Sequence, residues 1–195
     1  MKKTLIVIFT LIFSITSAQA ACDFLINIGD KGTKLYEKFD MFPMPMFKGQ
    51  FMLPIQSTEL CPNDNLNINI TVEYIFLGKK DDESEDEFKN ANLAAIRMIV
   101  FNDENNTESN NLTLMNYAKK VYGDFDTGIN PKIFNKYAIF ETGQSIVIYK
   151  RFYNEEGIID EEIYITNIEY DKKLGEFYNA LEEEEAAIES NGETN

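Results

Sequence analysis

Hydrophobic residues in the first half of the chain follow patterns that predict a helix among several strands. Residues 22–28 are strongly apolar and predict a short strand, and apolar positions three and four residues apart predict a helix over residues 31–39. Residues 67–77 alternate and are rich in β-branched side chains, whereas residues 93–101 are almost continuously apolar. Both predict strands, the second of them central in a sheet. Between them, the charged residues 78–90 predict the solvated connection of a hairpin rather than a calcium loop, because the glycine and final glutamate of such a loop are missing.

The second half of the chain repeats this order of patterns. A helical stripe over residues 112–122 ends at Gly123, a residue type that commonly terminates helices. Three short strands joined by tight turns then predict a β-meander, over residues 136–142, 145–153 and 160–167. A last amphipathic helix is expected from Asp171 to about Glu185, and the acidic residues 188–195 are expected to form a disordered tail.

These elements predict an α+β fold. Two parts of the chain, residues 30–101 and 109–167, each place a helix before antiparallel strands, which predicts two degenerate helix-plus-meander halves. Such an order favours an antiparallel sheet with the helices packed on one face. The length fits a single domain over residues 21–187.

A stretch rich in methionine, phenylalanine and proline, residues 41–54, interrupts this order. Its three prolines are expected to prevent regular structure, while methionine side chains adapt to many partner surfaces. Two interpretations stay open. The stretch folds back over the core, which the sequence favours, or it forms an interaction loop with the contact residues Met41, Phe42, Met44, Met46 and Phe47.

The first twenty residues have the parts of a bacterial secretory signal peptide. Lys2 and Lys3 precede an apolar run over residues 5–15, which is too short to span a bilayer as a stable helix. The segment ends in Ala18-Gln19-Ala20, the small-x-small pattern that signal peptidase cleaves. We therefore expect cleavage after Ala20, a mature chain without a transmembrane segment, and a periplasmic or secreted location. An uncleaved anchor is the less favoured alternative.

Cys22 and Cys61 are the two cysteines of the sequence. In the oxidising compartment that an export signal implies, such a pair is expected to form a disulfide. A lipid-modified cysteine at position 22 is the alternative. The sequence disfavours it, because the polar Gln19 stands where an acylation signal has an aliphatic residue.

The full chain carries a net charge of −15, and the loss of Lys2 and Lys3 with the signal makes the mature chain more negative still. A surface of this charge repels the phosphates of nucleic acids and anionic lipids, which disfavours nucleic acid as a partner. A cationic protein or peptide suits the charge better. The oligomeric state does not follow from the sequence.

The sequence contains no histidine, the usual general base of hydrolases and the commonest zinc ligand. The sequence motifs typical of serine hydrolases, nucleoside triphosphatases and dinucleotide-dependent enzymes are also missing from it. We therefore expect no cofactor and a non-enzymatic role. A hydrolase of cell-wall material that uses paired carboxylates stays open as an alternative, because aspartate and glutamate are abundant.

Both arginines, Arg97 and Arg151, fall within predicted strands. An arginine on a sheet face could bind a carboxylate or phosphate through two parallel hydrogen bonds. The favoured interpretation is instead a cross-strand ion pair, because Lys150 and Arg151 lie across a short turn from the acidic pair at positions 161 and 162.

Two short segments carry a resemblance to exported bacterial proteins. The first is the helix entry GDKGT at residues 29–33 with the helix end YEKF at residues 36–39, and the second is NYAKKVYGD at residues 116–124, ahead of the meander. With this order of elements, the chain resembles the small lipoprotein of the outer-membrane assembly machinery, the β-lactamase-inhibitor protein family and other, uncharacterised exported families. It differs from the first in lacking an acylation signal and from the second in having a single cysteine pair. The resemblance implies a non-enzymatic binding role and transfers no site residue.

These observations lead to one hypothesis with two alternatives. The chain is expected to be a binding or envelope-maintenance module that acts on a protein or peptide partner, with residues 41–54 as the candidate surface. The alternatives are the carboxylate-dependent hydrolase and an inhibitor of a basic enzyme, whose binding would depend strongly on salt.

Overall fold

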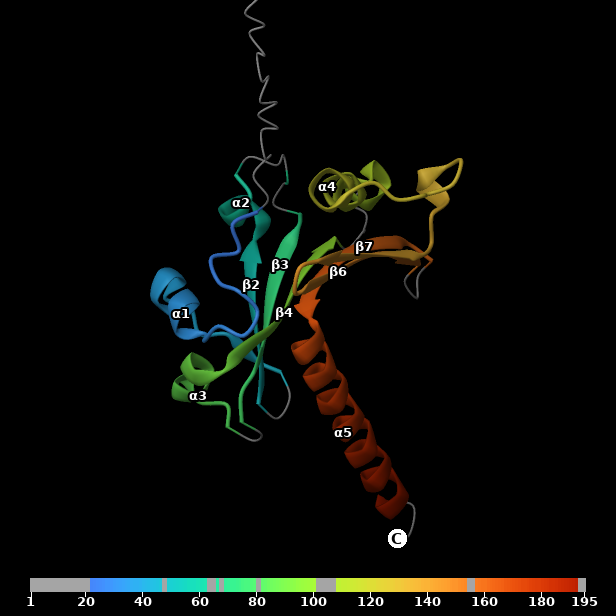
Figure 1. The fold of residues 1–195 in the computed structure, drawn as a ribbon. Coiled ribbons are helices and arrows are strands. Elements are labelled where there is room, and N and C mark those ends of the chain that lie inside the picture. The colour runs from blue at the N-terminus through green and yellow to red at the C-terminus, as the bar shows by residue number, and fades with distance from the viewer. Residues whose placement is uncertain are drawn as a thin grey trace, which may run out of the picture.

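The computed structural model describes residues 22–46, 49–62, 66, 69–79, 82–100, 108–153 and 157–192. The expected signal peptide lies outside these residues. Within them, helices cover a single antiparallel sheet of seven strands (Figure 1), which is the α+β class that the sequence predicts. No helix in the described part of the chain is long and apolar enough to cross a membrane.

The strands follow one another from edge to edge in the order β1-β2-β3-β4-β7-β6-β5. Their bounds are β1 Met44–Pro45, β2 Gln50–Gln56, β3 Thr71–Leu77, β4 Asn92–Val100, β5 Tyr137–Thr142, β6 Ser145–Tyr153 and β7 Ile159–Asn167. The helices are α1 Thr33–Phe39, α2 Ser57–Leu60, α3 Glu85–Asn90, α4 Thr113–Tyr122 and α5 Ile168–Gly192, with the short 3₁₀ turns η1 Glu108–Asn111 and η2 Pro131–Ile133.

The strand order is symmetric about its centre. Strands β2, β3 and β4 form one meander, β5, β6 and β7 form the other, and β4 pairs with β7 where the two meet. Each meander follows a helix, α1 in the first half and α4 in the second. The helix-plus-meander halves that the sequence predicts therefore lie side by side, with their last strands in contact.

One face of the sheet and the helices α1 to α4 enclose the main core. Alternate residues of β4, including Ile96, Met98 and Val100, point into this core. Each of the four helices contributes a fully or almost fully buried side chain, namely Leu35, Leu60, Phe88 and Leu114. Helix α4 ends at Gly123 as predicted, and the φ of +119° at this position is one that other residues rarely adopt.

Helix α5 packs on the opposite face, so the expectation that the helices share one face is wrong. Its residues Tyr170 and Leu174 contact Ile75, Ala94 and Ala95, which project away from the main core. The register between β3 and β4 shifts beside Ile75, and the extra residue in β4 lets both alanines face α5. The second face is therefore apolar at this point, and α5 shields it from water.

Helix α5 is also longer than expected. It begins at Ile168 and continues to Gly192, so it includes residues 188–192 of the expected tail, whereas residues 193–195 lie outside the described part. Gln50 Nε2, at the start of β2, donates a hydrogen bond of 2.8 Å to the Tyr178 hydroxyl and fixes the middle of the helix. In Figure 1, the C-terminal part of α5 extends away from the sheet.

Two local predictions fail near the N-terminus. Residues 22–28 form no strand, because Leu25 has a φ of +65° and its N–H bonds to the Asp23 carboxylate at 2.9 Å. The prolines of residues 41–54 do not prevent strands, since β1 includes Pro45 and β2 includes Pro54. Strand β1 pairs only with residues 51 and 52 of β2, so Pro54 lies where β2 forms the sheet edge, a position that tolerates a missing N–H.

The charged connection between β3 and β4 is more ordered than predicted. The two strands do pair, but helix α3 lies between them. The Ser84 hydroxyl caps this helix by accepting a hydrogen bond of 3.1 Å from the Glu87 N–H. Phe88 is fully buried in the main core, so one side of this charged segment is not solvated.

The predicted disulfide between Cys22 and Cys61 is present, and both residues are buried. It joins the start of the described chain to the end of α2. Beside it, the Asp23 N–H donates a hydrogen bond of 2.8 Å to the Leu60 carbonyl. The bridge therefore holds the irregular residues 22–28 against the first half of the sheet.

Removal of this disulfide is expected to destabilise the protein strongly. The bridge closes a loop with a sequence separation of 39 residues. The double variant C22A/C61A should lose about 4 kcal/mol of unfolding free energy, mostly because the open unfolded chain has more conformational entropy. Urea unfolding of the mature chain and the variant measures the loss, and reduced wild-type protein is the control that should match the variant. An unchanged midpoint would contradict the prediction.

Candidate functional site

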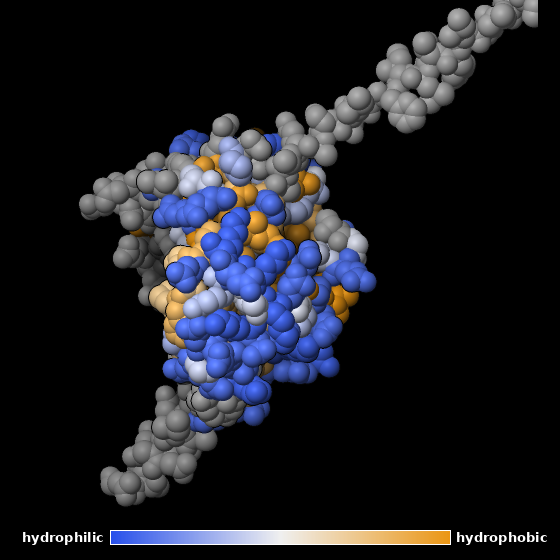
Figure 2. Space-filling view, turned by 90° about the vertical axis from the view of Figure 1, so that its left-hand side faces the viewer, coloured by the Kyte–Doolittle hydropathy of each residue, from blue (hydrophilic) through white to orange (hydrophobic). Residues whose placement is uncertain are grey.

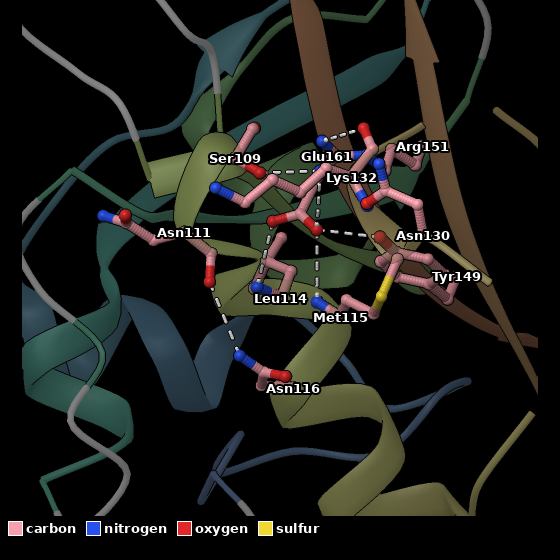
Figure 3. A network of polar contacts seen from close by, with 10 residues as sticks. All are labelled: Ser109, Asn111, Leu114, Met115, Asn116, Asn130, Lys132, Tyr149, Arg151 and Glu161. Atoms are coloured by element: carbon pink, nitrogen blue, oxygen red, sulfur yellow. Dashed lines mark hydrogen bonds and ion pairs between the residues drawn. The ribbon is translucent and has the colours of Figure 1, made fainter. Parts of the chain in front are cut away.

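The two arginines lie on opposite faces of the sheet. Arg151 of β6 stands opposite Glu161 of β7, and its Nη1 lies 3.4 Å from Glu161 Oε1 (Figure 3). Both side chains are buried in the main core, with exposed fractions of 1% and 0%. This is the cross-strand ion pair that the sequence favours over an anion site.

Glu161 supplies the cap that α4 lacks in its own sequence. The residue before this helix is Leu112, whose side chain makes no capping hydrogen bond. The carboxylate of Glu161 instead accepts hydrogen bonds from the N–H groups of Leu114 at 3.1 Å and Met115 at 3.3 Å. It also accepts one of 2.7 Å from the Tyr149 hydroxyl. Because its charge is favourable at the positive end of the helix dipole, the sheet itself fixes where α4 begins.

Arg151 connects both 3₁₀ turns to the sheet. Its Nη1 donates a hydrogen bond of 2.6 Å to the Ser109 carbonyl in η1, and its Nη2 donates one of 3.1 Å to the Lys132 carbonyl in η2. Its Nε is buried and has no acceptor among the residues that the structure describes. Since the guanidinium is enclosed and bonded on two sides, Arg151 is a structural residue.

Burial dominates the acid–base properties of this network. It raises the pKa of the Glu161 carboxyl above its ordinary value, while the hydrogen bonds from Tyr149 and Leu114 and the charge of Arg151 act in the opposite direction. Burial and the neighbouring Glu161 also raise the pKa of the Tyr149 hydroxyl. The hydroxyl therefore keeps its proton and remains a donor to the carboxylate.

Arg97 belongs to a row of alternating charges on the other face, which we name the charge ladder. Its members are Glu73 of β3, Arg97 of β4, Glu162 of β7 and Lys150 of β6. Arg97 Nε lies 2.7 Å from Glu73 Oε2, and Arg97 Nη1 lies 3.9 Å from Glu162 Oε2. Lys150 Nζ lies 3.3 Å from Glu162 Oε1. Both cations of the ladder have carboxylate partners, so Arg97 is not a vacant anion site.

A groove of about 340 Å³ lies between the charge ladder and α5, and we name it the α5 groove. Three ladder residues, Arg97, Lys150 and Glu162, line it together with Tyr164 of β7. The wall formed by α5 presents Asp171, Leu174 and Tyr178. Apolar surface comes from Ile75 and Ile148. The groove thus combines aliphatic, aromatic and charged groups.

The α5 groove also brings two carboxylates, Glu162 and Asp171, into one cleft, as a paired-carboxylate hydrolase requires. The Glu162 carboxylate is already engaged within the charge ladder, because Lys150 Nζ lies 3.3 Å from one of its oxygens and Arg97 Nη1 lies 3.9 Å from the other. Asp171 forms no ion pair with another described residue.

Residues 41–46, which we name the Met-rich segment, lie on the surface at one edge of the sheet. Met41, Phe42, Met44 and Met46 have exposed fractions of 42%, 46%, 47% and 41%. The favoured interpretation that residues 41–54 fold over the core holds for Phe51 and Leu53, which are fully buried in the main core. It is wrong for the Met-rich segment, because β1 pairs with the edge of β2 and these four side chains remain on the surface. Phe47, the fifth candidate contact, lies outside the described residues.

The surface on the side that carries α1 and α3 is largely hydrophilic, with hydrophobic residues in smaller areas (Figure 2). Comparisons with known protein families, with characterised proteins and with solved structures found no match for this chain. Any functional conclusion therefore depends on the geometry of the chain itself.

Sequence reasoning found Arg97 but not the residues around it. Glu73 is a single acid in an apolar strand, and it pairs with the one cation of the next strand, so this contact had a usable signal. Asp171, Tyr164 and Tyr178 had none, because they meet only where α5 packs on the second face. No periodic pattern in the sequence specifies that position.

The two arginines are expected to differ in their effect on stability. Arg151→Met leaves Glu161 buried without its counter-ion and should lower the unfolding free energy by about 3–5 kcal/mol. Arg97→Met is the matched control, and it should cost about 1 kcal/mol because the Arg97 side chain is 32% exposed. Urea unfolding followed by circular dichroism measures both losses. Equal losses for the two variants would show that the buried pair has no special role.

The buried carboxyl of Glu161 should also make stability depend on pH. Because burial raises its pKa, the folded chain holds this proton at pH values where the unfolded chain has released it. The contribution of Glu161 is therefore fully present below about pH 4 and is lost as the pH rises through the folded-state pKa. Relative to Glu161→Gln, which does not titrate, the wild type should become less stable as the pH rises from about 4 through the folded-state pKa of Glu161. Urea unfolding of both proteins at several pH values above about pH 4 measures this change. A wild type that becomes more stable relative to Glu161→Gln as the pH rises would contradict the prediction.

Proposed function

We propose that this chain is a non-enzymatic binding module of the bacterial envelope, which contacts a protein or peptide partner through the Met-rich segment. The exposure of four large apolar side chains within residues 41–46 carries this proposal. Apolar side chains that gather on an otherwise hydrophilic surface are typical of interaction sites.

The chemistry of the Met-rich segment supports binding by side chains. Methionine is unbranched and polarisable, so it can fit partner surfaces of different shape. Pro43 is buried and Pro45 pairs with Phe51 of β2, so the segment is anchored to the sheet at two points. Since proline also restricts the backbone, less conformational entropy is lost when a partner binds.

The proposed location rests on two observations. The Cys22–Cys61 disulfide fits an oxidising compartment outside the cytoplasm. The composition of residues 1–20 fits a signal peptide that is cleaved after Ala20. An inhibitor of a basic enzyme would be one form of this binding role, and the acidic charge of the chain supports it.

Loss of the exposed apolar side chains is expected to weaken partner binding strongly without unfolding the protein. The variant M41S/F42S/M44S/M46S should retain at least about tenfold less partner from an envelope extract than the immobilised wild type, because truncated apolar anchors cost roughly 1–2 kcal/mol each. Quantitative mass spectrometry of the retained proteins gives the ratio.

A matched control removes four exposed apolar residues elsewhere, in the variant I129S/I133S/Y153S/I168S. It should retain the partner as the wild type does, and urea unfolding should show that both variants are folded. The proposal fails if the Met-rich variant retains the same proteins in the same amounts.

A further inference from the structure

Two cations and two carboxylates line the α5 groove, and they differ in whether they are paired. Arg97 and Lys150 each have partners within the charge ladder. Asp171 lies on the wall of the groove, and it takes part in no ion pair among the described residues, whereas its helix neighbours Lys172 and Lys173 pair with glutamates on α5. The groove therefore contains one carboxylate that a positively charged group from outside can bind.

Two tyrosines place aromatic surface next to this carboxylate. Tyr164 lies on the sheet and Tyr178 on the α5 wall. Burial raises the pKa of the Tyr164 hydroxyl, and the charge of Asp171 raises it further, as expected where the local potential is negative. Lys150 Nζ lies 5.9 Å from the centre of the Tyr164 ring, so this ring already stands beside one cation. Carboxylates and aromatic faces together attract ammonium and guanidinium groups.

An apolar surface continues from the groove to the edge of the sheet. Ile148 of β6 stands directly between Tyr164 of β7 and Ile139 of β5 in the strand register. Ile139 and Tyr137, on the edge strand β5, have exposed fractions of 55% and 67%. On the same face of the sheet, helix α5 packs against Ala94 and Ala95 of β4. It does not reach β5, so Ile139 and Tyr137 stay exposed.

The size and charge of the site indicate the kind of partner. A groove of about 340 Å³ is small compared with most ligand pockets, which span roughly 300–1,000 Å³, and it fits one long side chain. The net charge of −15 attracts basic proteins over a long range and repels acidic ones. A protein segment with a basic residue among apolar residues matches both the groove and its surroundings.

We propose that the α5 groove binds a lysine or arginine side chain of a partner protein. Asp171 forms the ion pair with the bound cation, and Tyr164 and Tyr178 contact its aliphatic stem. Ile148, Ile139 and Tyr137 receive the apolar neighbours of the basic residue. This site is distinct from the Met-rich segment, so it stands independently of the function proposed above.

Three short peptides test the proposal by NMR titration of the ¹⁵N-labelled mature chain. The probes are acetylated and amidated Ile-Leu-Lys-Leu-Ile and its analogues with norleucine or glutamate in place of lysine. The lysine peptide should shift the amide signals of residues 148–150, 162–164 and 171–178. The norleucine peptide should bind about three- to fivefold more weakly, the glutamate peptide more weakly still, and added salt should reduce only the preference for lysine.

Variants of Asp171 test its role as the ion-pair partner. Asp171→Asn should weaken binding of the lysine peptide by about three- to fivefold, and Asp171→Lys should shift the preference toward the glutamate peptide. Glu176→Gln is the matched control, because it removes the same charge from the same helix at a residue that pairs with Lys172, and it should bind like the wild type.

Equal affinities for the lysine and norleucine peptides in the wild type would overturn the proposal, and this comparison holds even if an Asp171 variant fails to fold. Unchanged affinity in a folded Asp171→Asn variant, or signal shifts confined to residues 41–46, would also overturn it. The M41S/F42S/M44S/M46S variant should bind the lysine peptide normally. Failure of one proposed site is therefore distinguishable from failure of the other.

Discussion

The pairing of β4 with β7 joins the two halves of the molecule into one fold. Its register runs from Ile96 opposite Ile165 to Val100 opposite Glu161. Neither half encloses the main core by itself, because that core takes buried residues from both, such as Phe88 of the first half and Tyr149 of the second. Once the central strands pair, Leu35 of α1 and Leu114 of α4 belong to the same core. The positions of both helices therefore depend on this contact.

The neighbouring pairing of β6 with β7 separates structural charges from surface charges. Lys150 stands opposite Glu162, and Arg151 stands opposite Glu161. Since successive residues of a strand point to opposite faces, one ion pair lies in the core under α4 and the other lies in the groove beside α5. A register shift of one residue would exchange the two environments and leave a charged residue in the core without its partner. The register that pairs Arg151 with Glu161 in the core therefore also places Lys150 and Glu162 in the groove.

Features that depend on local pattern could be predicted from the sequence. The second meander and the pairing of β3 with β4 follow from the alternation of side chains and the turn residues between strands, and the Cys22–Cys61 disulfide follows from the presence of two cysteines behind an export-like segment. Strand β2 was missed because proline is unfavourable in most strands, and only the short partner β1 makes Pro54 acceptable. The place of α5 was missed because it depends on two alanines that the irregular register of β4 turns outward. The ion pair of Arg151 could be predicted because Glu161 lies on the next strand across a short turn. The groove around Arg97 could not, because it depends on where α5 packs.

The prolines in β1 and β2 also bear on aggregation. A long sheet edge with free N–H and C=O groups is a template on which further copies of a chain can grow into fibrils. At this edge, β1 spans only Met44–Pro45, and Pro45 and Pro54 have no N–H to offer. The chain can therefore expose apolar methionine and phenylalanine side chains while offering an incoming strand few backbone N–H groups for hydrogen bonds. Replacing these prolines would leave the same apolar residues on an edge that polymerises more readily.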